Sequence, residues 1–139
     1  MRSIYLLIAG SILASCTTAP PPPGAPMRST SGERAYQNLI AGKVPQQPIS
    51  CLPNYNANDM SIIDGQTLGF RVGSGNTTAY LVHLTPGCEN LGSGTYALLS
   101  RQPGGMGLCR GDIQQVIDTM NHITAGSCTI AAIVPYVRR

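Results

Sequence analysis

The sequence has little charge and few aromatic side chains. Only 11% of its residues are charged, Trp is absent, and Phe occurs once. A chain kept disordered by high net charge is thereby excluded, and a formal charge of +3 is too small for a strongly basic nucleic-acid arm. A large aromatic-lined pocket is equally unexpected. Because the chain has 139 residues, it has room for one small domain.

Glycine, proline and cysteine are plentiful instead. The chain contains 16 Gly and 11 Pro, which favour loops, turns and short strands over a helical bundle. It also contains 5 Cys, an unusual number for this length. The positions of these cysteines therefore carry much of what the sequence says about compartment and fold.

The first residues have the pattern of an export signal. Arg2 gives a positive start, and residues 4–12 (IYLLIAGSI) form an apolar run. The run is too short to span a bilayer, which takes about 20 residues of helix. Residues 13–16 (LASC) follow and resemble the lipobox of bacterial lipoproteins. An ordinary secretory signal that ends near a cysteine is the alternative.

The lipobox resemblance implies an anchor and a compartment. It makes residues 1–15 a lipoprotein signal peptide and Cys16 the site of lipidation, so that acyl chains hold the protein on a membrane. In lipoproteins an Asp after the lipidated cysteine often retains the product at the inner membrane. Thr17 stands there, which favours the outer membrane of the cell envelope, facing the periplasm.

Residues 16–32 are expected to be the lipidated cysteine followed by a proline-rich tether. Five of the prolines lie in this stretch, and the four at residues 20–23 are consecutive, which favours an extended polyproline conformation. A ligand for a proline-recognition groove is the alternative. We expect the stretch to hold the following domain away from the lipid surface.

Residues 33–139 are expected to form a single disulfide-linked β-domain. A short helix is predicted over residues 33–41, where apolar side chains recur at helical spacing. Thr30 and Glu33 have the spacing of a capping box at its start. The predicted fold class is mainly β, a small antiparallel β-barrel or sandwich with this one N-terminal helix.

From residue 49 onward the pattern changes to strands and turns. The pair Asp64-Gly65 predicts a turn between two strands, and residues 73–76 predict a second turn that makes a hairpin of its neighbours. Strands are predicted at residues 67–72, 77–84, 95–100 and 129–137.

Residues 112–123 fit two secondary structures. Ile113, Val116, Ile117 and Met120 have the spacing of one helix face. The preceding Gly111 and the β-branched residues suit a strand as well. Periodicity alone leaves both open.

Several short stretches share their order and cysteine positions with known sequences. They lie at residues 39–43 (LIAGK), 49–53 (ISCLP), 63–67 (IDGQT), 70–71 (FR), 86–88 (PGC), 108–113 (LCRGDI), 126–128 (GSC) and 135–136 (PY). Together they resemble a family of small secreted bacterial proteins of unknown function. The resemblance implies a strand leading to a turn after residues 109–112, and it supplies no activity and no catalytic residues.

Four cysteines remain when Cys16 is set aside. An even number in a small exported domain indicates two disulfides. Three pairings are possible. We expect Cys51–Cys128 and Cys88–Cys109, because Cys51 opens the first strand and Cys128 the last, while the other two flank the middle hairpin. No CxxC motif occurs and the spacings match no zinc module, so no metal is expected.

No catalytic residue and no cofactor site is predicted. The chain has no G-x-S-x-G elbow, no Walker loop and no H-E-x-x-H motif. His83 and His122 are the only histidines, and rim or surface positions are their expected places. Asp64 and Asp112 stand beside glycines, where bonding to the local backbone is the usual role.

The leading hypothesis is a lipid-anchored cell-envelope protein with a non-catalytic binding or structural role. Its expected partners are the membrane, through the lipid anchor, and a protein of the envelope, with no nucleic acid. This hypothesis predicts an exposed apolar or Tyr-bearing patch. The alternative is a small envelope hydrolase that uses a turn Asp and a His, which requires these two side chains to be hydrogen-bonded in a cleft.

Overall fold

A curled antiparallel sheet forms most of the computed structural model, which describes residues 27–53, 56–72, 77–101 and 107–139. Within these residues the helix is α1 (Thr30–Ile40), and the strands are β1 (Lys43–Pro45), β2 (Cys51–Leu52), β3 (Met60–Asp64), β4 (Thr67–Val72), β5 (Thr78–Leu84), β6 (Tyr96–Arg101), β7 (Leu108–Cys109), β8 (Ile113–Asp118) and β9 (Ile123–Arg138). A 3₁₀ turn (Ala57–Asp59) precedes β3.

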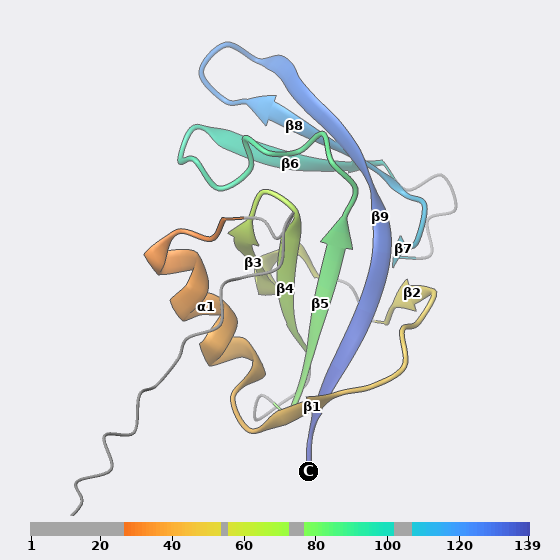
Figure 1. Cartoon of the computed structure of the whole chain (residues 1–139). Coiled ribbons are helices and arrows are strands. Elements are labelled where there is room, and N and C mark those ends of the chain that lie inside the picture. The colour runs from red at the N-terminus through yellow and green to blue at the C-terminus, as the bar shows by residue number, and fades with distance from the viewer. Residues whose placement is uncertain (1–26, 54–55, 73–76, 102–106) are drawn as a thin grey trace, which may run out of the picture.

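The main sheet has the strand order β3-β4-β5-β9-β8-β6, and β1 pairs with the C-terminal end of β9. It curls into half of a barrel, while β2 and β7 form a separate two-stranded sheet (Figure 1). The predicted fold class, mainly β with one N-terminal helix and two disulfides, is confirmed. The half-barrel follows from the long, bent β9, which is shared by both halves of the sheet.

The helix begins three residues earlier than predicted. Ser29 is its N-cap, and the Ser29 hydroxyl accepts a hydrogen bond from the Gly32 amide at 3.0 Å. This cap replaces the expected box of Thr30 and Glu33, because the side chain one residue earlier already satisfies a free amide of the first turn. Residues 28–32, assigned to the tether from composition, therefore belong to the folded domain.

The predicted hairpins are present. Gly65 and Gln66 form the two-residue turn between β3 and β4, where Asp64 pairs with Thr67. β4 and β5 pair from Thr67 opposite His83 to Val72 opposite Thr78. The turn predicted at residues 73–76, between these two strands, lies outside the described residues.

Residues 113–118 form a strand, one of the two secondary structures that the sequence left open. β8 lies between β6 and β9 and is paired with both, so both of its backbone edges are satisfied as a strand. Its buried side chains, Gln114 and Val116, are two residues apart. β9 begins at Ile123, six residues before the predicted start, and the two strands form a hairpin.

Two disulfides are present, but the expected pairing is wrong. The bonds are Cys51–Cys109 and Cys88–Cys128, not Cys51–Cys128 and Cys88–Cys109. Cys51 lies directly opposite Cys109 in the β2–β7 pair. Cys128 lies inside β9 rather than at its start, where β9 passes the segment that follows β5.

The close passage of this segment along β9 depends on glycine. The Thr85 amide donates to the Thr129 carbonyl at 2.9 Å, and a Cβ on Gly87 would collide with the Ser127 carbonyl oxygen. The φ angle of Gly87 is +119°, which L side chains rarely adopt. Cys88 is therefore brought to Cys128, a contact between residues far apart in the chain.

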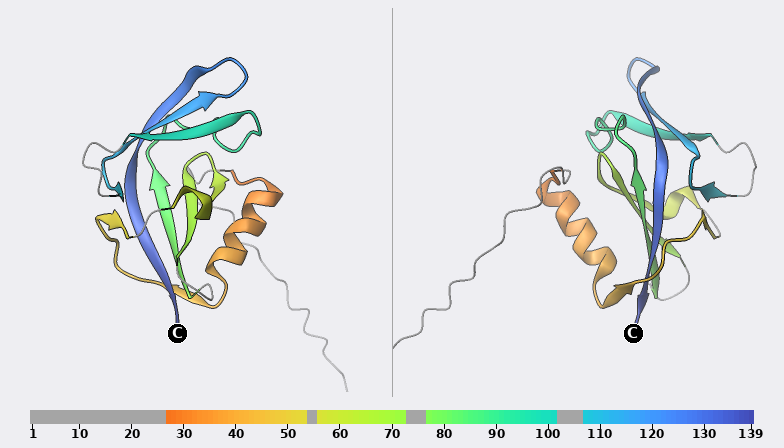
Figure 2. Two further views of the ribbon diagram at one scale, coloured as in Figure 1. Left: turned by 180° about the vertical axis from the view of Figure 1, so that it is seen from behind. Right: turned by 45° about the vertical axis from the view of Figure 1, so that its right-hand side comes forward.

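The sheet has a core on each side. The inner face carries the larger cluster, to which β2 and β7 contribute Leu52 and Leu108. On the outer face α1 packs against β3, β4 and β5 through Leu39, Ile63, Ala79 and Leu81. Figure 2 shows the helix and the β2–β7 pair on opposite sides of the sheet.

The helix lies close to the sheet because two glycines leave room for it. A Cβ on Gly32 of α1 would collide with the Ile63 carbonyl oxygen, and one on Gly69 of β4 would lie 2.5 Å from a Leu39 methyl carbon. The outer face next to β3 and β4 is thus covered by α1.

Candidate functional site

Arg28 joins the start of α1 to the sheet. Its Nε donates to Oδ2 of Asp64 at 2.9 Å, and its Nη1 donates to Oε2 of Glu33 at 3.2 Å. The guanidinium carbon lies 4.0 Å from the centre of the Tyr36 ring, within the range of a cation–π contact. One arginine thus contacts β3 and two turns of the helix, a role that the tether assignment of residue 28 missed.

Both carboxylate oxygens of Asp64 are occupied. The side chain is 2% exposed, Oδ2 accepts from Arg28, and Oδ1 accepts from the Gln66 amide at 2.8 Å. The predicted bonding of this aspartate to the local backbone is confirmed. Asp64 therefore closes the β3–β4 turn and neutralises Arg28, and each of its oxygens accepts a hydrogen bond from the protein itself.

A groove of 380 Å³ lies beside this ion pair, between the first turn of α1, the end of β3 and the segment after β5. Its lining includes Met27, Ser31, Ile62, Asp64 and Glu89. The Glu89 carboxylate accepts a hydrogen bond from the Gly87 amide at 2.8 Å, and this bond lowers the pKa of Glu89. The two acids of the groove are therefore both bonded to groups of the protein itself.

His83 lies near Asp64, but no hydrogen bond joins these two described side chains. It stands on β5 opposite Thr67, on the same outer face as Leu81, and is half-buried. Burial lowers the pKa of His83, and the negative charge of Asp64 only partly opposes this effect. The imidazole is consequently held in its neutral form without the carboxylate contact that a general base needs.

The remaining candidates, His122 and Asp112, lie in turns. His122 ends the β8–β9 turn with φ of +57°, and its amide donates to the Asp118 carbonyl oxygen at 2.8 Å. Asp112 accepts a hydrogen bond from the Cys109 amide at 2.7 Å, the local role expected of it. Among the described residues no hydrogen bond joins His83 or His122 to a carboxylate, so the geometry required by the hydrolase hypothesis is not observed.

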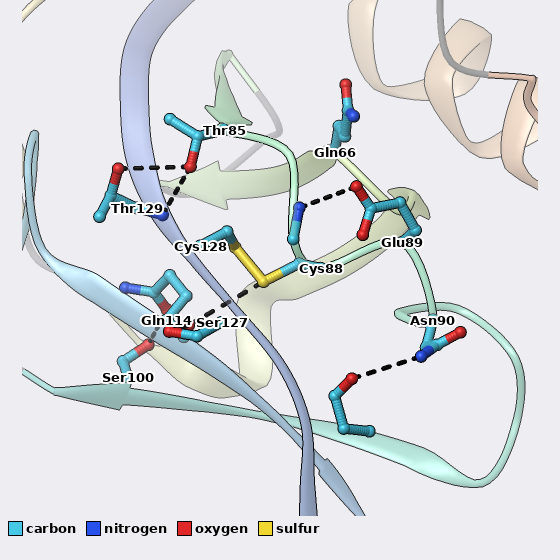
Figure 3. The surroundings of a disulfide bond; sticks show 12 residues. Gln66, Thr85, Cys88, Glu89, Asn90, Ser100, Gln114, Ser127, Cys128 and Thr129 are labelled. Atoms are coloured by element: carbon cyan, nitrogen blue, oxygen red, sulfur yellow. Dashed lines mark hydrogen bonds between the residues drawn. A yellow bond between two sulfur atoms is a disulfide. The ribbon is translucent and has the colours of Figure 1, made fainter.

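The Cys88–Cys128 bond lies in the inner core next to Gln114, with Cys88 Sγ 3.9 Å from the Gln114 carbonyl oxygen (Figure 3). Ser100 donates to the Gln114 side-chain oxygen, and Ser127 Oγ donates to the Gln114 carbonyl oxygen at 3.3 Å. Gln114 is fully buried, and its Nε2 has no hydrogen-bond partner in the described part of the chain. Sequence reasoning missed this residue, because a glutamine within a β-branched stretch gives no sign of burial.

Four of the five large apolar side chains that are exposed in the described residues, all except Met27, lie on one part of the sheet. This part, the limb, is formed by β6, β8 and residues 123–129 of β9, with the turn between β8 and β9. The exposed fractions are 49% for Leu99, 45% for Ile113, 74% for Met120 and 60% for Ile123. Since Leu99 pairs with Gln115 and Arg101 with Ile113, Leu99 and Ile113 share the outer face. The main contacts of α1 are to β3 and β4, so the helix leaves this face bare. An exposed apolar patch is what the binding hypothesis predicts.

Cys16 and the predicted signal peptide lie outside the described residues, so lipidation stays a prediction. In the described ranges no helix has the length and apolar character needed to cross a bilayer, and no three His, Cys, Asp or Glu side chains gather in a way that could hold a metal ion.

No family model, no curated protein and no solved structure matches the chain.

Removing the Arg28 side chain should destabilise the domain. We expect Arg28→Ala to lower the free energy of unfolding by about 2 kcal/mol, because it leaves the Asp64 carboxylate buried without a counter-charge. The loss is smaller than for a fully enclosed pair, since Arg28 is 25% exposed. Urea denaturation measures it. Arg34→Ala, on the exposed side of the same helix, is the control and should cost less than about 0.5 kcal/mol; equal losses would contradict the assignment.

The stability of the domain should fall as the pH drops from about 7 to 5, and His83 should account for part of the fall. Because the pKa of His83 is lowered in the folded state, the unfolded chain takes up a proton first as the pH drops through the ordinary value of 6.5. Thermal unfolding of wild type and His83→Gln across this range tests this. The variant should show the shallower decline, and identical slopes would show that burial of His83 has no such effect.

Proposed function

We propose that this protein is a lipid-anchored component of the bacterial cell envelope, held at the outer membrane on the periplasmic side, with a non-catalytic binding role. The anchor is Cys16 of the LASC motif, and the tether runs from there to the start of the folded domain near Arg28. Two disulfides in a small domain support an oxidising compartment such as the periplasm.

The observation that carries the binding role is the exposed outer face of the limb. Leu99 and Ile113 lie there without a covering helix. When a partner covers these apolar side chains, their surface is removed from water, and the hydrophobic effect favours association.

The open edge of β6 indicates what kind of partner fits. Within the described residues β6 pairs only with β8. The Thr95 carbonyl oxygen accepts a hydrogen bond from the Thr119 amide. Main-chain groups face the partner strand at every second residue of an antiparallel pair, so those of Leu98 and Ser100 point away from β8. An extended segment of another envelope protein can add to this edge as a strand and place an apolar side chain beside Leu99.

The anchor is tested by metabolic labelling with radioactive palmitate in the bacterial host. We expect label on the wild-type protein and none on Cys16→Ser, because the thiol is the acceptor of the lipid. Thr17→Ser keeps the thiol and is the matched control, so it should be labelled like wild type. An unlabelled wild-type protein, or label that persists in Cys16→Ser, would show that residues 13–16 do not act as a lipobox.

The contact surface is tested by placing a photo-crosslinking amino acid at Leu99 and, as a control, at Asn38 on the exposed side of α1. We expect an adduct with one envelope protein from Leu99 alone, and its loss when Ile113→Lys is added, since a charge on this face opposes apolar contact. Adducts of equal yield from both positions, no adduct from Leu99, or an adduct with a second copy of this chain would each contradict the proposed partner.

A further inference from the structure

The two disulfides differ in their access to solvent. Cys88 is 0% exposed and Cys128 is 4% exposed. Cys51, in contrast, is exposed, and Cys109 is half-buried. A thiolate must reach a sulfur atom to attack a disulfide, so the rate of exchange depends on this difference in access.

The Cys88–Cys128 bond is enclosed by the sheet. Cys88 and Cys128 both belong to the inner core cluster, where Val116 and Ile130 are also buried. The segment that carries Cys88 lies so tightly against β9 that a Cβ on Gly87 or Gly126 would collide with the facing backbone. An attacking thiol can reach this bond only after that segment has separated from β9.

The Cys51–Cys109 bond lies instead across the short β2–β7 pair. The two cysteines are directly opposite each other, and the other pair of this sheet within the described residues is Leu52 with Leu108. Both leucines are 1% exposed and pack into the inner core. The Arg110 amide also donates to the Ser50 carbonyl oxygen at 2.8 Å. These contacts join the two strands in addition to the sulfur–sulfur bond.

We propose that Cys51–Cys109 is a thiol–disulfide exchange site that takes a dithiol as its reaction partner, such as a protein with a C-x-x-C pair. The partner's thiolate attacks Sγ of the exposed Cys51, a mixed disulfide forms, and Cys109 leaves as a thiolate that takes up a proton. The partner's second thiolate then attacks its own sulfur in the mixed disulfide and releases Cys51.

The exchange balances as a two-electron transfer. The protein disulfide becomes two thiols, and the partner dithiol becomes a disulfide. The reverse reaction with an oxidised partner closes the bond again. Because Cys88–Cys128 stays closed and Leu52 and Leu108 stay buried, the main sheet remains folded in both states. This chemistry goes beyond the proposed binding role and does not depend on a partner at the limb.

Partial reduction under native conditions tests the site. The oxidised full chain is incubated with dithiothreitol, samples are quenched with N-ethylmaleimide, and the remaining disulfides are then reduced and alkylated with iodoacetamide. Trypsin puts each of the four cysteines on its own peptide, at residues 44–71, 72–101, 102–110 and 111–138. We expect maleimide on the peptides of Cys51 and Cys109 at least about tenfold faster than on those of Cys88 and Cys128. Equal rates or the reverse order would overturn the proposal.

The double variant Cys51→Ser/Cys109→Ser separates exchange from unfolding. It should keep the circular dichroism spectrum of wild type, since the β2–β7 pair is also joined by other contacts, and it should show no rapid labelling on the peptides of Cys88 and Cys128. Loss of the β spectrum would show that this bond is required for the fold and cannot be an exchange site. In wild type, fast labelling that appears only at urea concentrations that unfold the chain would likewise refute it.

Discussion

The structure depends on β9 being hydrogen-bonded along both of its edges. One edge pairs with β5 from Leu84 to Thr78. The other meets β8, then Gly111 and Ile49 through single main-chain contacts, and finally β1. Since both halves of the sheet share this one strand of 16 residues, its bend sets the curl of the half-barrel. Pro135 is tolerated inside β9. Its carbonyl oxygen accepts a hydrogen bond from the Gln46 amide, so the main-chain groups of residue 135 face residue 46 and not β5. The amide hydrogen that proline lacks is therefore not needed for pairing with β5.

This dependence explains which parts of the fold the sequence could predict. The β3–β4 and β4–β5 hairpins and the helix depend on signals a few residues apart, such as Asp64-Gly65, and all three are present, although the helix begins three residues before the predicted start. β8 was ambiguous because its helical spacing is real, and only its pairing with both β6 and β9 decides for a strand. The disulfide pairing was wrong for the same reason. It depends on where β9 passes residue 87, and no local pattern contains that information.

The candidate site shows a similar division. Asp64 and Asp112 could be assigned to turns from their neighbouring glycines, and both bond to the nearby backbone. Arg28 could not be found, since it stands next to a proline-rich stretch whose composition indicates a tether and its partner is 36 residues away. The Arg28–Asp64 ion pair fixes the start of α1 on β3. Asp64, which the hydrolase hypothesis treats as a catalytic residue, therefore holds the helix on the sheet.

The position of the helix also determines which surface is left for binding. Gly32 and Gly69 let α1 approach the outer face at β3 and β4, and Arg28 holds its first turn there. The same face continues onto β8 and β6, where the helix does not reach and Leu99 and Ile113 stay exposed. The two halves of the sheet that β9 joins therefore differ, since one is covered by α1 and stabilises the domain while the other is bare and available to a partner. Arg101 and Gln115 share that bare half, but Arg101 donates to the Gln115 side-chain oxygen at 3.0 Å, and this pair leaves Leu99 and Ile113 exposed on either side of it.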